Sequence, residues 1–254
     1  MRINSAVAAV CGVVALSALA VPAAHADERF GDTDITGVTV NDGAPVVVGT
    51  SARTVTVEVT ATDPAGFEQI NATLYHGSFE AQSATVSPDT ACGATTDTTS
   101  TCRLTFTLTP GTAPADDTLA GAWSVSAFAI AADSDAVFLN SAAGFSVLRE
   151  TQVTADAAPE RVKWGKTLTV TGAVRHAQWA TGTYGPAAAG QAVELQFRKK
   201  GCTTFTTLKT VPTTAGGTVT TTVRAYADGY YRWSYAGSTN TAAAVSEADY
   251  VDVR

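Results

Sequence analysis

Four carboxylates between residues 63 and 135 have the residue types and spacing of a calcium site. Asp63 opens one Pro/Gly-containing turn with Glu68 just after it, and Asp133 and Asp135 lie in a second turn. Carboxylate oxygens are the ligands that Ca²⁺ prefers, and extracellular modules bind it with dissociation constants of roughly 10⁻⁴–10⁻³ M. The same runs are also ordinary turn starters and solvated loop tips. Calcium is therefore one hypothesis, and it requires both turns to lie at one end of a folded unit.

A further acidic run, residues 32–37 (Asp-Thr-Asp-Ile-Thr-Gly), begins like the loop of a helix-loop-helix calcium site. It has oxygen ligands at positions 1, 3 and 5 and a glycine at position 6. Position 12 is Gly43, where that site needs a bidentate Glu, and a strand-like Val-Thr-Val run replaces the flanking helix. The run therefore does not predict a site of this kind.

The chain offers few histidines for catalysis or metal binding. Beyond residue 26 the chain contains two histidines, His76 and His176, one in each half. No Gly-x-Ser-x-Gly nucleophile motif accompanies them, and no Cys/His cluster has the spacing of zinc ligands. We therefore expect no catalytic residues and no zinc, and predict that the protein is not an enzyme.

Three cysteines follow residue 26. Cys92 and Cys102 flank a Gly/Thr/Ser/Asp stretch typical of a connecting loop, and a disulfide between them would stabilise the fold by roughly 3 kcal/mol. The loop that it closes is also the feature that a protease inhibitor would present. Cys202 is left over and follows three basic residues. It is an inert thiol, an intermolecular disulfide partner or a nucleophile.

Basic and aromatic residues gather in the second half and could serve binding. The cations could face an anionic polymer such as wall teichoic acid, or the acidic first half, and they are Arg198, Lys199, Lys200, Lys209, Arg224 and Arg232. Aromatic rings could stack on sugars, but strand alternation assigns Tyr231, Trp233 and Tyr235 to a core. The exposed candidates for carbohydrate or cell-wall binding are then Tyr230, Arg232, Trp179 and Tyr184. Nucleic acid is not expected, given a net charge of −7.

The elements that must position these residues are β-strands. The chain has 41 Thr, and apolar and polar residues alternate with period 2 in many short runs separated by turn residues. The clearest apolar faces are Val55, Val57, Val59 and Ala61; Cys102, Leu104, Phe106 and Leu108; and Leu168, Val170, Gly172 and Val174. No segment shows convincing helical periodicity. If the strand from Arg53 is strand B of a sandwich and that from Trp123 is strand F, the acidic turns are the B–C and F–G loops, which share one end.

Charge divides the chain into two units. Residues 27–150 carry 16 acidic and 4 basic residues, a net of −12, whereas residues 151–254 carry 7 and 11, a net of +4. Each unit is long enough to bury its own core. Gly121-Ala122-Trp123 and Gly229-Tyr230-Tyr231 open equivalent late strands. The sequence therefore predicts an all-β protein of two tandem immunoglobulin-like β-sandwich domains of the same architecture.

The first 26 residues have the pattern of a cleaved secretory signal. Arg2 precedes an uncharged apolar run over residues 6–21, then Pro22 and an Ala-His-Ala cleavage site at 24–26. The apolar run is short for a membrane span, and Cys11 lacks the small preceding residue of a lipid-attachment site. We expect a secreted protein that begins at Asp27, with no membrane anchor and with disulfides permitted.

Four segments of the second unit form a recognisable pattern: Ala158–Glu160, Gly165–Gly172, Leu195–Gly201 and Asp228–Gly237. With these segments the second unit resembles the C-terminal module of a group of uncharacterised actinobacterial secreted proteins. The first unit is similar to the N-terminal part of the same group around Pro45–Thr50 and Leu74–Gly77. The resemblance covers nearly the whole chain after residue 26. It implies exported Ig-like modules without an established activity, and some members carry a calcium-binding label.

These observations favour a secreted, non-catalytic binding or structural protein with an unknown extracellular ligand, which could be a cell-wall polymer or a protein. A calcium-binding protein with an acidic site in the first unit is one alternative. A carbohydrate-binding or cell-wall-binding module and a protease inhibitor are two others.

Overall fold

The computed structural model describes residues 27–90 and 92–254. The expected signal peptide, residues 1–26 with Cys11, lies outside the described residues. Regular structure in the described part is nearly all β-strand, with two short 3₁₀ turns. Among the described residues, no helix is long and apolar enough to cross a membrane.

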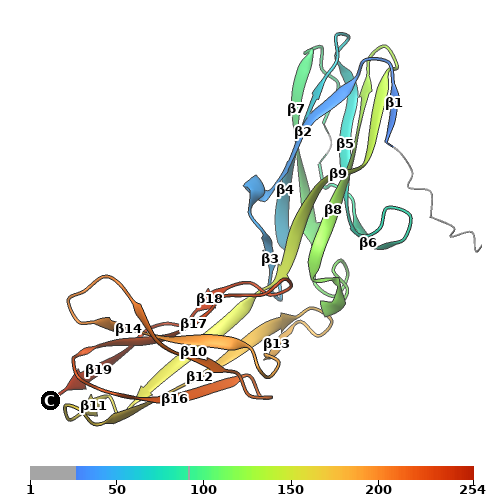
Figure 1. Ribbon diagram of the computed structural model, residues 1–254. Helices are drawn as coiled ribbons and strands as arrows, with labels where there is room; N and C mark the ends of the chain where they lie inside the picture. Colours follow the sequence, from blue (N-terminus) through green and yellow to red (C-terminus); the bar gives the residue numbers. More distant parts are fainter. Residues whose placement is uncertain (1–26, 91) are drawn as a thin grey trace, which may run out of the picture.

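Residues 27–150, the first module, form two packed sheets (Figure 1). The larger sheet has the order β1-β9-β8-β5-β6, with β3 beside β9, and the smaller has the order β2-β4-β7. The strands are β1 (Glu28–Phe30), β2 (Asp34–Val40), β3 (Val46–Val48), β4 (Arg53–Thr62), β5 (Phe67–Gly77), β6 (Gln82–Val86), β7 (Thr99–Leu108), β8 (Gly121–Ala131) and β9 (Ala136–Arg149). The 3₁₀ turns η1 (Asn41–Gly43) and η2 (Asp117–Leu119) complete it.

Residues 151–254, the second module, form a second pair of sheets. One has β12 paired with β10, β13 and β16, and the other has the order β11-β19-β17-β14-β15, with β18 beside β17. The strands are β10 (Thr151–Ala158), β11 (Arg161–Val162), β12 (Thr167–Gln178), β13 (Thr183–Pro186), β14 (Ala192–Lys199), β15 (Thr206–Pro212), β16 (Thr218–Arg224), β17 (Gly229–Tyr235), β18 (Ala244–Val245) and β19 (Asp249–Val253).

Both modules have the same immunoglobulin-like arrangement. In each, a short early strand pairs in parallel with the last strand of the module, β3 with β9 and β11 with β19. The late central strands β8 and β17 both open on a glycine, Gly121 and Gly229, followed two residues later by a buried aromatic ring. The all-β, Ig-like sandwich prediction is therefore confirmed.

The period-2 patterns predict the core correctly. On β4 the side chains at 55, 57, 59 and 61 are at most 1% exposed, and on β7 those at 102, 104, 106 and 108 are at most 2% exposed. Tyr231, Trp233 and Tyr235 of β17 are buried in the second module, as their alternation requires. Apolar β-branched and aromatic side chains on one face of each strand fill the space between the sheets.

The disulfide forms as predicted between Cys92 and Cys102. Cys102 is buried on β7, and Thr95 in the loop exchanges two backbone hydrogen bonds with Phe67 at the start of β5. The loop therefore lies against the sandwich and does not project as a free loop.

The two modules are joined without a linker. Strand β9 ends at Arg149, β10 begins at Thr151, and Glu150 alone separates them. Figure 1 shows the sandwiches meeting end to end at a bend, with β3 and β13 near the meeting point. Because the chain passes from β9 to β10 through a single residue, the contacts around Glu150 determine how the modules are oriented.

Candidate functional site

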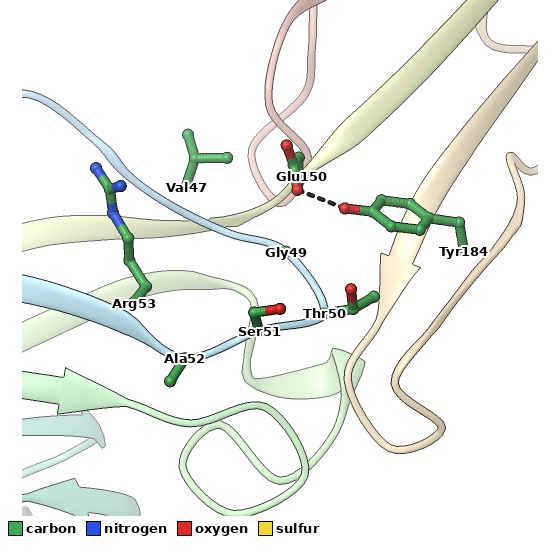
Figure 2. A pocket seen from close by; sticks show the side chains of 8 residues that line it. All are labelled: Val47, Gly49, Thr50, Ser51, Ala52, Arg53, Glu150 and Tyr184. Atoms are coloured by element: carbon green, nitrogen blue, oxygen red, sulfur yellow. Dashed lines mark hydrogen bonds between the residues drawn. The ribbon is translucent and has the colours of Figure 1, made fainter.

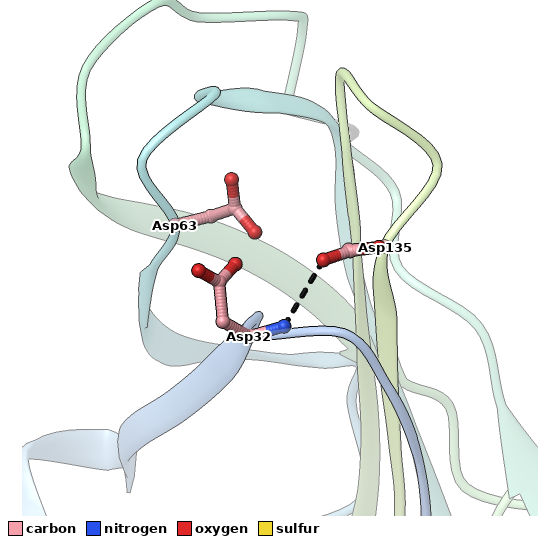
Figure 3. Close-up of side chains that lie close together, drawn as sticks. All are labelled: Asp32, Asp63 and Asp135. Atoms are coloured by element: carbon pink, nitrogen blue, oxygen red, sulfur yellow. Dashed lines mark hydrogen bonds between the residues drawn. The ribbon is translucent and has the colours of Figure 1, made fainter.

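Three carboxylates meet at the end of the first module away from the junction (Figure 3). Asp32, Asp63 and Asp135 each offer an oxygen, and these oxygens lie within 4.8 Å of one another. Asp63 directly follows β4 and is 2% exposed, with its carboxylate accepting bonds from the Thr33 hydroxyl (2.5 Å) and the Ala65 amide (2.7 Å). The Asp135 carboxylate accepts from the Asp32 amide at 3.0 Å. Sequence-distant loops thus form one acidic cluster.

Two of the four predicted ligands take part in this cluster. Asp63 and Asp135 come together because the β4–β5 and β8–β9 turns share one end of the sandwich, as the strand assignment requires. Asp133 lies in the same turn as Asp135, and its carboxylate accepts from the Asp135 amide at 3.2 Å. Glu68 is exposed on β5 and, like Asp133, is not one of the three clustered carboxylates.

Asp32 is the member that the sequence interpretation missed as a partner of these turns. It follows the three-residue strand β1, whose antiparallel pairing with β9 brings the next turn of chain against Asp135. Gly31 is required at that turn, since its φ is +75° and a Cβ there would lie 1.6 Å from the Asp135 carboxylate. The short run Glu28–Phe30 was the available signal, but it is too brief to identify as a strand from alternation.

The cluster has the electrostatics of a cation site. Desolvation by neighbouring protein atoms raises the pKa of the exposed Asp32 carboxyl, and the negative charges of Asp63, Asp135 and Asp133 raise it further. The adjoining pocket has a volume of about 400 Å³ and is lined by Asp32, Thr62, Asp63, Pro64 and Thr98. Three hard oxygen donors of like charge are a donor set that suits Ca²⁺ better than a transition metal.

At the junction, Trp179 of the second module belongs to the core of the first. It follows β12, is 1% exposed and packs in the first module's hydrophobic cluster together with Ala177. Its indole Nε1 donates to the Val48 carbonyl of β3 at 3.2 Å, and its amide donates to Asp117 at 2.8 Å. The prediction that Trp179 is an exposed binding residue was wrong, because the loop that carries it folds onto the neighbouring module.

Arg149, at the same boundary, forms bonds with residues of both modules. Its guanidinium pairs with Asp117 at 2.7 Å, with the arginine side chain 17% exposed, and its Nε is buried without a partner among the described residues. Its backbone amide donates to Asn240, and its carbonyl accepts from the Ala242 amide. The last residue of β9 is thus tied to a loop of the second module.

Tyr184, a second predicted binding residue, is a half-buried junction residue (Figure 2). Its hydroxyl donates to the Glu150 carboxylate, and burial together with this bond raises its pKa to about 12. Gly49 leaves room for the pair, since a Cβ there would lie 2.2 Å from Glu150 Oε2. The adjoining pocket has a volume of about 330 Å³ and is lined by Val47, Gly49, Thr50, Ser51, Ala52, Arg53, Glu150 and Tyr184.

The other two predicted binding residues, Tyr230 and Arg232, lie on the outer face of the larger sheet of the second module. Both are half-buried. The Arg198 guanidinium lies over the Tyr230 ring with Cζ 4.2 Å from the centroid, and the Arg232 guanidinium lies 3.8 Å over the Phe205 ring. Cys202 lies in the same β14–β15 hairpin loop as Phe205 and is a free and exposed thiol.

Comparisons with known proteins concern the fold. No family model matches this chain, and no curated protein matches it. Among solved structures, the D00–D0 domain of intimin is 15% identical over 85% of this chain and 100% of its own, with a TM-score of 0.28. The titin domains z1z2, in complex with telethonin, are 16% identical over 89% and 98%, with a TM-score of 0.26. A superoxide reductase (neelaredoxin) from Ignicoccus hospitalis is 20% identical over 41% and 82%, with a TM-score of 0.29. These structural similarities assign no activity, ligand or partner to this chain.

Proposed function

We propose that this protein is a secreted, non-catalytic extracellular protein whose two Ig-like modules act as one rigid binding or structural unit. The observation that carries the proposal is Trp179, a second-module residue buried in the first module's core. A buried tryptophan contributes a large apolar contact area, and its loss from such a site costs about 3–5 kcal/mol. Free rotation between the modules would require that contact to be given up.

Three further features support a fixed orientation. There is no linker to flex, since Glu150 alone separates β9 from β10. Asp117 holds Arg149 by an ion pair and accepts the Trp179 amide, so one carboxylate bridges the strand and the loop. A hydrogen bond from the Tyr184 hydroxyl of the second module to the Glu150 carboxylate adds a further contact at the junction. Interfaces between domains are mobile by default, and the buried, apolar contact of Trp179 and Ala177 with the first module's core argues against mobility here.

The test is a distance distribution between spin labels on the two modules. One label is placed on Cys202, which is exposed, and the other on a Thr39→Cys variant, which is exposed on β2. We expect one narrow distribution for the full chain after residue 26. A matched chain with Gly-Gly-Ser inserted after Glu150 should give a broad one. An equally broad distribution without the insertion would overturn the proposal.

A second candidate function is calcium binding at the acidic cluster, and the convergence of Asp32, Asp63 and Asp135 favours it. With a dissociation constant of roughly 0.1–1 mM, 10 mM Ca²⁺ would stabilise the first module by about 1.4–2.7 kcal/mol. We expect a higher melting temperature of the full chain with CaCl₂ than with MgCl₂ at equal ionic strength.

A pair of variants makes the calcium test specific. Asp135→Asn removes one charge from the cluster, and Asp97→Asn removes one charge from an exposed loop position in the same module. The first should abolish the calcium-induced rise and the second should keep it. No rise at 10 mM Ca²⁺ with the unaltered chain would rule the site out.

A further inference from the structure

A ladder of cations and aromatic rings covers the outer face of the second module's larger sheet. Across neighbouring strands, Arg198 of β14 is paired with Tyr230 of β17, which is paired with Tyr250 of β19. The two tyrosine rings lie 5.2 Å apart between centroids. Arg232 lies one rung away on the same face, opposite Gln196. Alternating positions on strands point to one face, so these side chains share a surface.

The aromatic rings hold the two arginines in place. The Arg198 guanidinium lies 4.2 Å over Tyr230 and 5.1 Å from the centroid of Phe205, and the Arg232 guanidinium lies 3.8 Å over the same Phe205 ring. Phe205 comes from the β14–β15 hairpin, which folds over the face. Guanidinium groups thus cover Tyr230 and Phe205, and the Lys200 ammonium lies 5.5 Å from the Tyr250 centroid, so the surface presents charge and not bare rings. This arrangement disfavours the stacking of a neutral sugar on Tyr230.

Neither arginine takes part in a salt bridge within the described residues. Arg198 and Arg232 form no salt bridge with a carboxylate there, whereas the nearby Lys200 lies 3.8 Å from Asp228. Arg198 donates to the Cys202 carbonyl, and the Nε of Arg232 donates to Gln196. The two terminal nitrogens of Arg232 donate no hydrogen bond in the described part of the chain. Two pre-oriented guanidinium groups therefore lie side by side outside any salt bridge, and Glu194 on the same face is linked to Arg232 only through the Gln196 side chain.

We propose that this face, built on Arg198 and Arg232, binds an anionic polymer that carries phosphate groups. The planar fork of guanidinium donors matches the oxygens of phosphate, and stacking on a ring lowers the entropy lost on binding. Diagonal neighbours on paired strands are about 7–8 Å apart, so a chain with repeated charges can contact both arginines. The assignment rests on the proposed extracellular binding function, for which it names the ligand class.

The experiment measures binding of the full chain after residue 26 to poly(glycerol phosphate) by calorimetry at two salt concentrations. Polygalacturonate and dextran serve as a carboxylate polymer and a neutral polymer. Binding should be strongest to the phosphate polymer, absent with dextran and weaker at higher salt. Binding to none of them, or stronger binding to polygalacturonate, would overturn the proposal. So would self-association of the protein that accounts for the signal.

Matched variants locate the surface. Arg198→Gln with Arg232→Gln should weaken binding at least about tenfold, since two charge-assisted contacts are lost. Arg175→Gln with Arg224→Gln removes the same charge from the opposite sheet of the module and should change affinity less than about twofold. Equal losses of affinity in the two double variants would show that binding depends only on net charge, and would refute the assignment.

A third variant separates folding from recognition. Arg198→Lys with Arg232→Lys keeps the charge and loses the planar fork, so it should fall between the unaltered chain and the Gln pair. Melting curves of all variants check that the module is folded. The spin-label distance should stay narrow in each of them, so a failed polymer assay and a flexible junction are distinct results.

Discussion

Replacing Trp179 with alanine tests the reasoning about the junction most directly. The indole is 1% exposed, packs in the first module's core and donates to the Val48 carbonyl. The residue belongs to the second module, so the substitution leaves the first module's own sequence intact. Any destabilisation of the first module must therefore arise from the contact between the modules.

The expected magnitude follows from the size of the group removed. Truncating a buried aromatic side chain to alanine costs about 3–5 kcal/mol, of which the indole hydrogen bond contributes about 1 kcal/mol. Trp179→Phe, which keeps most of the ring area, should therefore cost less than Trp179→Ala. In a two-module chain, losing this coupling should also separate the two unfolding transitions.

Scanning calorimetry and urea unfolding followed by far-ultraviolet circular dichroism measure both effects. Trp164→Ala is the matched control, since Trp164 is 66% exposed and makes an edge contact with Tyr226 within the second module. It should change stability by less than about 1 kcal/mol. The reasoning fails if Trp179→Ala stays within about 1 kcal/mol of the unaltered chain and leaves the spacing of the transitions unchanged.

Three further predictions concern charge, the disulfide and pH. Asp117→Asn should destabilise the chain by about 1–3 kcal/mol in urea unfolding, because a mostly buried Arg149 loses its counter-charge. No change would show that the ion pair does not contribute to the free energy of unfolding. Replacing Cys92 and Cys102 with serine should cost about 3 kcal/mol, since they close a short loop, and adding reductant should then have no further effect. Burial lowers the pKa of His176, so below pH 6.5 the unfolded chain binds a proton that the folded chain resists, and stability should fall from pH 7 to pH 5. His176→Asn should show a smaller fall in melting temperature over that range, and an equal fall would contradict the assignment.

The core of each sandwich could be predicted because its signal is local. On β4 every second residue is apolar from 55 to 61, and on β7 from 102 to 108, and that pattern alone determines which face is buried. The shortest strands carry no such signal. β1, β3 and β11 have two or three residues each, and they form because a partner strand is already in place.

The acidic cluster was half predictable for the same reason. Asp63 and Asp135 follow from the order of long strands, which places their two turns at one end. Asp32 depends on β1, whose pairing with β9 spans more than 100 residues of sequence. Glu68 was a reasonable neighbour in sequence, but it is already part of β5, where its side chain is exposed.

Trp179 shows where composition misleads. A tryptophan in a polar, Gly-containing loop has the pattern of an exposed ligand-binding residue, because sequence does not reveal that another module covers it. The pairing of arginines with rings was equally hidden. Phe205 reaches Arg198 and Arg232 only through the fold of the β14–β15 hairpin.

The parallel pairing of β3 with β9 determines how the first module bears a pulling force. A pull on the chain before β3 and after β9 acts in opposite directions on two parallel neighbours. The register from Val46 opposite Val147 to Val48 opposite Arg149 is then loaded in shear, and its evenly spaced hydrogen bonds must break together. Because β9 continues into β10 across one residue, tension passes to the second sandwich without slack, and there β11 and β19 repeat the same geometry.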